Sequence, residues 1–66
     1  MYSKVYDLMG QPVRLGDQIV YSSLDNDGVP ELKVGVLQNI LEPEVLVVGY
    51  DLLEKVAPYQ IVKVEM

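Results

Sequence analysis

The sequence of 66 residues contains no cysteine, no histidine and no tryptophan. Without cysteine no disulfide can form, and without cysteine or histidine the common zinc sites have no ligands. A nucleophile activated by histidine is excluded as well, and we expect no cofactor. The absence of cysteine is compatible with a reducing compartment, so we expect a cytoplasmic protein.

Positive charge is also scarce. Five Lys and Arg stand against ten Asp and Glu, which gives a net charge of −5. The stretch from Asp25 to Glu54 carries −6 because its single base is Lys33, and the rest of the chain carries +1. Binding to nucleic acid or to an anionic membrane needs clustered Lys and Arg, which are missing. We therefore expect neither of these partners.

Long apolar runs are absent too. No run reaches the roughly 18 residues of a membrane span, and the opening Met-Tyr-Ser-Lys is unlike a signal peptide. The chain starts with Met and has no tag-like tail, so we expect a complete small gene product that forms one domain over residues 1–66. At this length folding buries roughly 60% of the surface of the unfolded chain, so stability is marginal.

The residues that are present favour β-structure. Of the 33 apolar residues, twelve are Val, nine Leu, five Tyr and three Ile, against a single Ala. Val, Ile and Tyr suit a pleated surface and lose rotamer freedom in a helix. We expect an all-β domain, and a small barrel in particular, because closure removes sheet edges that would otherwise aggregate.

Turn residues divide the chain into five or six short strands. Gly10, Pro12 and Gly16 mark two early turns, and Asp25-Asn26-Asp27-Gly28 marks the longest loop. The predicted strands cover 4–8, 13–15, 18–22, 31–40, 44–50 and 61–65. Segment 51–56 is either a strand or a single helical turn, and 57–60 is a connector with room for one 3₁₀ turn.

Two strand segments carry further expectations. In 31–40, Leu32, Val34 and Val36 share one face, and Gly35 suggests a bulge or a bend. The apolar run from Val45 to Tyr50 is either a buried central strand or a pairing edge.

The order of these turns resembles a known group of proteins. Residues 7–21 contain an Asp-x-x-Gly turn, then an apolar residue, a Gly-Asp turn and a short strand that ends in Ile-Val-Tyr. Segments 32–40 and 58–64 continue the same pattern. This is similar to small SH3-like barrel proteins encoded by tailed bacteriophages. The resemblance implies an SH3-like barrel in the cytoplasm of a bacterial host, and it carries no catalytic residues. The acidic loops and the missing Trp of the SH3 peptide groove argue against nucleic-acid and polyproline binding.

Several acidic residues invite specific chemistry. Placing Gly28 at position six of a calcium-binding EF-hand loop puts Ser23 first and Val34 twelfth, which are both wrong ligands, so we favour an ordinary acidic turn. For Asp17 we favour a turn role in which its carboxylate accepts backbone N–H groups. Glu42 and Glu44 flank Pro43 without a catalytic partner, so we expect no metal site and no enzyme.

The tyrosines and the surplus of apolar residues point to binding instead. For Tyr6, Tyr21 and Tyr50 we favour core or rim positions, with an interface role as the alternative. A 66-residue barrel has few inward positions, so 33 apolar residues overfill it. A contiguous apolar patch on the outside marks a partner surface, and we expect self-association, most simply a two-fold dimer.

The leading hypothesis is a non-catalytic protein-binding module, such as an inhibitor or modulator of a host protein. The alternatives are an oligomer that binds a small molecule or nucleotide, and a structural or accessory component of a phage complex. The candidate interaction surface comprises the acidic residues and tyrosines of the middle and late chain: Tyr21, Asp25, Asp27, Glu31, Glu42, Glu44, Tyr50 and Tyr59.

Overall fold

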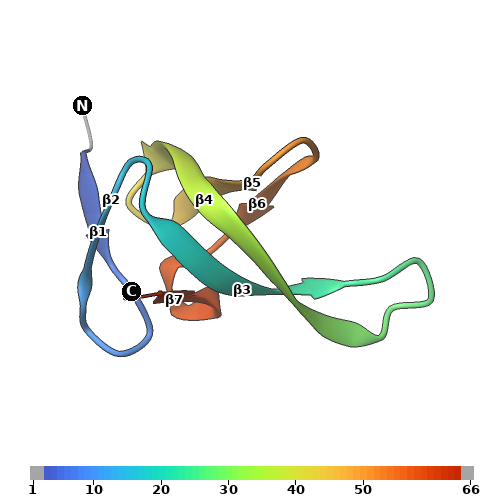
Figure 1. The fold of residues 1–66 in the computed structure, drawn as a ribbon. Coiled ribbons are helices and arrows are strands. Elements are labelled where there is room, and N and C mark those ends of the chain that lie inside the picture. The colour runs from blue at the N-terminus through green and yellow to red at the C-terminus, as the bar shows by residue number, and fades with distance from the viewer. Residues whose placement is uncertain (1–2, 65–66) are drawn as a thin grey trace.

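A computed structural model describes residues 3–64 and confirms the predicted all-β class (Figure 1). The elements are β1 (Lys4–Tyr6), β2 (Pro12–Arg14), β3 (Gln18–Leu24), β4 (Pro30–Glu42), β5 (Val45–Gly49), β6 (Leu53–Val56), the 3₁₀ turn η1 (Pro58–Gln60) and β7 (Ile61–Lys63). The 3₁₀ turn before the last strand is confirmed, whereas the seven strands exceed the predicted five or six. No helix within residues 3–64 is long and apolar enough to cross a membrane.

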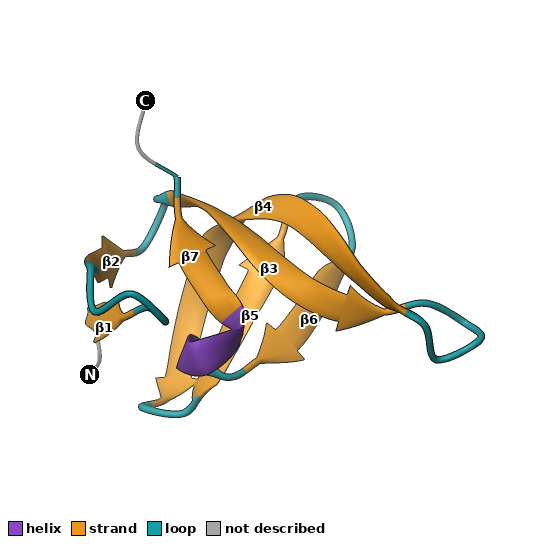
Figure 2. Ribbon diagram, turned by 90° about the horizontal axis from the view of Figure 1, so that it is seen from below, coloured by secondary structure: helices purple, strands orange, loops and turns teal. Residues whose placement is uncertain are grey.

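The strands form two antiparallel sheets. One contains β1 and β2, and the other contains five strands in the order β6-β5-β4-β3-β7. The thirteen residues of β4 join the larger sheet together, because the first part of β4 pairs with β3 and the second part with β5. β4 bends along its length, and the sheet curls with it (Figure 2).

The predicted closure into a barrel is wrong. β6 and β7 are the two edges of the five-stranded sheet and do not pair with each other. The chain passes between these edges through Ala57 and η1, which begins at Pro58 and so offers one backbone donor fewer. β7 pairs with β3 over only three residues. An open seam therefore remains between β6 and β7.

Ten buried apolar residues form one core cluster inside the curled sheet. Val5 and Val13 contribute from the two-stranded sheet, so the cluster joins both sheets. The other members come from the five-stranded sheet: Ile19, Tyr21, Leu37, Ile40, Leu46, Val48, Val56 and Ile61. Because Leu46 and Val48 are fully buried, β5 is a central strand and not a pairing edge.

Gly35 permits a close approach between strands rather than a bulge. The pairing register is regular across Gly35, and the register shifts of β4 lie between Leu37 and Asn39 and between Ile40 and Glu42. A Cβ atom at Gly35 would lie 2.8 Å from the Cα of Gly49 and 3.1 Å from the ring of Tyr21. The absence of a side chain therefore lets β4 pack tightly against β5.

β3 and β4 continue past the body as a two-stranded arm, residues 22–32, which projects from one end of the molecule (Figure 1). The loop at its tip is shorter than the predicted 23–30, because pairing extends to Leu24 and Pro30. Segment 51–56 forms strand β6 rather than a helical turn, because residues 53–56 find a full partner in β5. The end of the predicted last strand, Glu65, lies outside the described residues.

Asp7 fastens the small sheet to the large one. The side chain is buried, and one carboxylate oxygen accepts the backbone N–H groups of Met9 (2.9 Å) and Gln11 (2.8 Å). The other oxygen accepts the N–H of Lys63 in β7 at 2.8 Å. Asp17 has the predicted turn role, since its carboxylate accepts the N–H of Arg14 at 2.9 Å.

Candidate interaction surface

The side chains on the two faces of β3 and β4 differ in how deeply they are buried. Ile19, Tyr21 and Leu37 are at most 3% exposed and point into the core. Side chains alternate along a strand, so the intervening residues Val20 and Val34 point outward. Val34 is 50% exposed. The face bearing Leu32, Val34 and Val36, which the sequence grouped together, is therefore the outer one.

This outer face carries no charged residue. We define it as the outward-pointing residues of β3, of the part of β4 paired with it, and of β7: Gln18, Val20, Ser22, Leu24, Pro30, Leu32, Val34, Val36 and Val62. Val62, Val20 and Val34 form a row across the three strands, since Val20 pairs with both other residues. An antiparallel sheet usually turns polar residues toward water, so this face departs from the rule.

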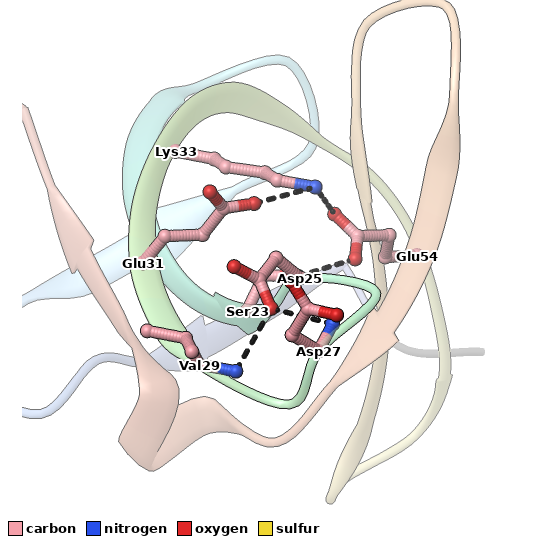
Figure 3. A network of polar contacts seen from close by, with 7 residues as sticks. All are labelled: Ser23, Asp25, Asp27, Val29, Glu31, Lys33 and Glu54. Atoms are coloured by element: carbon pink, nitrogen blue, oxygen red, sulfur yellow. Dashed lines mark hydrogen bonds and ion pairs between the residues drawn. The ribbon is translucent and has the colours of Figure 1, made fainter.

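The inner side of the arm is polar instead. Ser23 pairs with Glu31, and Tyr21 pairs with Lys33, so these side chains share the side that faces the body. Opposite them lies Glu54 on β6, an edge strand of the same curled sheet (Figure 3). The arm thus reverses the arrangement of an ordinary surface hairpin, with apolar residues outward and polar residues inward.

Glu54 is the centre of this polar contact. One carboxylate oxygen accepts the Ser23 hydroxyl at 2.5 Å, and the other lies 3.3 Å from the Lys33 ammonium nitrogen (Figure 3). Lys33 also lies 3.6 Å from a carboxylate oxygen of Glu31. These bonds tie β6 to the base of the arm across the curled sheet.

The contacts shift three pKa values. The hydrogen bond from Ser23 is the main cause that lowers the pKa of Glu54, and Lys33 and Tyr21 act in the same direction against the opposing effect of burial. The hydrogen bond to Glu54 raises the pKa of Lys33. Burial, followed by the hydrogen bond and charge of Glu54, raises the pKa of Tyr21. The charged forms of Glu54 and Lys33 are therefore favoured in the folded protein.

The tip of the arm is closed by a side chain. One carboxylate oxygen of Asp25 accepts the backbone N–H groups of Asp27 (2.8 Å) and Val29 (2.9 Å), as shown in Figure 3. This is the acidic turn favoured by the sequence. Within residues 3–64, no three Asp or Glu side chains gather closely enough to hold a metal ion.

A groove lies along the open seam, beside the arm. It has a volume of about 530 Å³ and combines apolar and polar walls. Leu24 and Val56 supply apolar surface, and the polar groups come from Ser23, Glu54, Lys55 and Gln60. Gln60 holds η1 in place, since its side-chain oxygen accepts the N–H of Ala57 at 2.9 Å.

The predicted acidic residues fall into two separate groups. Asp25, Asp27 and Glu31 lie on the arm. Glu42 and Glu44 lie at the turn between β4 and β5, at the other end of β4. The acidic stretch is therefore not one continuous surface. Only its first group lies on the arm, which also contributes Ser23 and Leu24 to the lining of the groove.

The tyrosines are divided as well. Tyr21 is 3% exposed and belongs to the core, so it is not part of an exposed surface. Tyr50 is exposed and its hydroxyl accepts the side-chain amide of Gln18 at 3.1 Å. Tyr59 is 71% exposed and lines a shallow hollow with Tyr6 and Glu44. Tyr2 lies outside the described residues.

Sequence reasoning missed the importance of Glu54 and of the outward valines. The alternation of Leu32, Val34 and Val36 was visible, but alternation alone does not say which set faces the core. Comparisons with protein-family models, with curated proteins and with solved structures find no match for this chain.

Proposed function

We propose that this chain is a non-catalytic protein-binding module with an SH3-like fold, which binds a basic segment of another protein in the seam groove. The observation that carries the proposal is the groove between β6 and the arm, with its mixed lining and with Glu54 in its wall. The curled antiparallel sheet and the 3₁₀ turn before β7 support the SH3-like assignment.

The charge around the groove selects the partner. Glu54, Asp25, Asp27 and Glu31 contribute four negative charges in the groove or on the arm beside it. Lys33 and the groove-lining Lys55 offset two of them, which leaves a net charge of −2. An acidic surface of this kind complements a basic partner and speeds its approach. The apolar wall formed by Leu24 and Val56 gives the partner's aliphatic side chains a place to pack.

The bacteriophage resemblance supports the proposal that the partner is a bacterial host protein. A small acidic module that occupies a basic site would inhibit or redirect the protein that bears it. No catalytic step is required of any residue in this mechanism, because binding alone blocks the site.

The test is affinity capture from bacterial lysate with identification by mass spectrometry. Three baits are compared: the native chain, Asp27→Asn with Glu31→Gln, and Glu42→Gln with Glu44→Gln. The two variants each remove two negative charges, but only the first removes them beside the groove. Asp25 is left intact because it closes the arm tip.

We expect the native chain and the Glu42/Glu44 variant to retain the same basic protein in similar amounts. The Asp27/Glu31 variant should retain at least about tenfold less of it. Equal retention by all three baits would show that the arm acids do not select the partner. Failure of the native chain to retain any protein above a bead control would overturn the proposed function.

A further inference from the structure

We infer that the outer face of β3, β4 and β7 is the contact surface of a two-fold dimer, in which two copies pack sheet against sheet with their arms pointing in opposite directions. This surface lies on the opposite side of the arm from Ser23 and Glu54. Ser22, Leu24 and Pro30 belong to this surface and also line the seam groove, so a dimer that uses the whole face covers that wall of the groove. The inference goes beyond the proposed function, because it concerns the oligomeric state and not the binding of a different protein.

The outer face is largely apolar, which indicates that another molecule covers it. The central row Val62–Val20–Val34 is flanked by Gln18 and Val36 on one side and by Ser22 and Leu32 on the other. Leu32 is 77% exposed although it lies in the paired part of a strand. Contiguous apolar surface of this kind on a small protein marks an interaction site.

The chemistry of the face favours a second copy over a different protein. The chain as a whole carries −5, yet none of the nine residues of the outer face is charged. A basic partner finds no acidic group to pair with on this face, whereas two identical uncharged faces leave no charge unpaired when they meet. A two-fold axis also places the same row of valines on both sides of the contact, as isologous interfaces require.

Charge at the ends of β3 decides the orientation. The acidic tip with Asp25 and Asp27 follows the end of β3, and Arg14 and Lys63 lie near its start. Arg14 pairs in register with Lys4, so this end of the molecule gathers three bases. Asp7 and Asp17 lie at the same end, and a carboxylate oxygen of Asp17 is 3.6 Å from the Lys63 ammonium nitrogen, so three bases against two acids leave a net charge of +1. Oppositely directed arms bring the acidic tip of one copy toward the basic end of the other, whereas parallel arms would bring the two acidic tips together.

The area required is large relative to the molecule. A standard stable interface buries about 800 Å² per partner. That is roughly a sixth of the 4620 Å² that this chain exposes, so the contact must use the whole outer face. A charge placed in the middle of the face would then be buried without a counterion, and a single substitution is enough to separate the copies.

The test compares Val34→Lys with Leu52→Lys. Val34 lies in the central row, whereas Leu52 is 85% exposed in the turn between β5 and β6 and is not one of the nine residues of the outer face. Both substitutions add one lysine in place of an exposed aliphatic residue. Sedimentation velocity and light scattering are measured from about 1 to 500 μM, and far-UV circular dichroism at low concentration verifies that each variant is folded.

We expect the native chain and Leu52→Lys to reach twice the mass of one 7.4-kDa chain, with Val34→Lys raising the dissociation constant by at least about thirtyfold. A native chain that stays at 7.4 kDa up to 500 μM, or that forms a larger assembly, overturns the dimer. Equal dissociation of both lysine variants overturns the assignment of the face.

The orientation has its own test at low salt. With opposed arms, Asp27→Lys weakens the dimer several-fold, and adding Arg14→Glu to the same chain restores it. With parallel arms, Asp27→Lys would instead strengthen the dimer by relieving the repulsion between the tips. The sign of this change therefore separates the two arrangements.

Discussion

The β3–β4 ribbon has two halves that use the same alternating pattern in opposite ways. In the body half, Ile19 and Leu37 point inward and are no more than 1% exposed. In the arm half, the inward residues Ser23 and Glu31 are polar, and the outward residue Leu32 is 77% exposed. The pattern of a strand says which residues share a face, but what lies beneath that face decides whether it is buried.

The two halves differ because only one of them lies over the hydrophobic core. The body half covers the core cluster, which includes residues from both sheets. The arm extends beyond that cluster, and the side chain it meets across the sheet is the Glu54 carboxylate. A charged group is stabilised by hydrogen-bond donors, and Ser23 and Lys33 supply them. The apolar side of the arm is left for intermolecular contact.

The largest expected effect comes from truncating one leucine in each half. Leu37→Ala leaves a cavity in the core and should lower the free energy of unfolding by about 3 kcal/mol. Leu32→Ala removes an exposed side chain and should change it by less than about 0.5 kcal/mol. Urea unfolding at a fixed, low protein concentration measures both, so that association does not contribute. Equal losses in the two variants would contradict the division of the ribbon.

A second comparison concerns two aspartates that close loops. Asp7 is buried and accepts three backbone N–H groups, so Asp7→Ala leaves them unpaired and should cost about 2–3 kcal/mol. Asp25 is exposed and accepts two, so Asp25→Ala should cost about 1 kcal/mol or less, because water replaces the carboxylate. Thermal unfolding, monitored by circular dichroism, measures the loss of stability in the two variants. A greater loss at Asp25 would mean that the arm supports the body.

The smallest expected effect concerns the polar contact beneath the arm. Glu54→Gln removes the charge that holds Lys33 and should cost less than about 1 kcal/mol at pH 7, because both side chains are partly solvent-exposed.

The effect of Glu54→Gln depends on pH in a defined direction. The pKa of Glu54 is lowered in the folded protein, so its carboxylate stabilises the fold above the usual glutamate range near pH 4.3. This contribution disappears as the pH falls through the lowered pKa. The stability difference between the native chain and Glu54→Gln should therefore be present at pH 7 and shrink below about pH 4. A difference that grows on acidification would contradict the assignment.

Much of the local structure could be read from the sequence. The 3₁₀ turn near Pro58, the turn role of Asp17 and the acidic turn at Asp25 each follow from short-range chemistry of single residues. The identity of segment 51–56 did not follow, since Asp51 and Glu54 have the spacing of a helical capping box, which competed with strand propensity. Its pairing with β5 decided the outcome, and pairing is a contact between distant residues.

The candidate site was less predictable than the fold. The acidic residues were visible as a run along the chain, but the thirteen residues of β4 separate the Glu42–Glu44 turn from the arm. Tyr21 was a candidate for the surface and is in the core, because register with Lys33 puts it on the inner face. Glu54 gained its role only because β6 is brought opposite the base of the arm.

The sequence by itself determined the all-β class, the positions of most turns and the surplus of apolar residues, because propensity and turn chemistry act over a few neighbouring residues. Only the tertiary structure decided that the sheet stays open between β6 and β7, that Gly35 serves close packing, and that the valine row faces outward. Each of these depends on strand register and curvature, which are set by contacts between residues far apart in the chain.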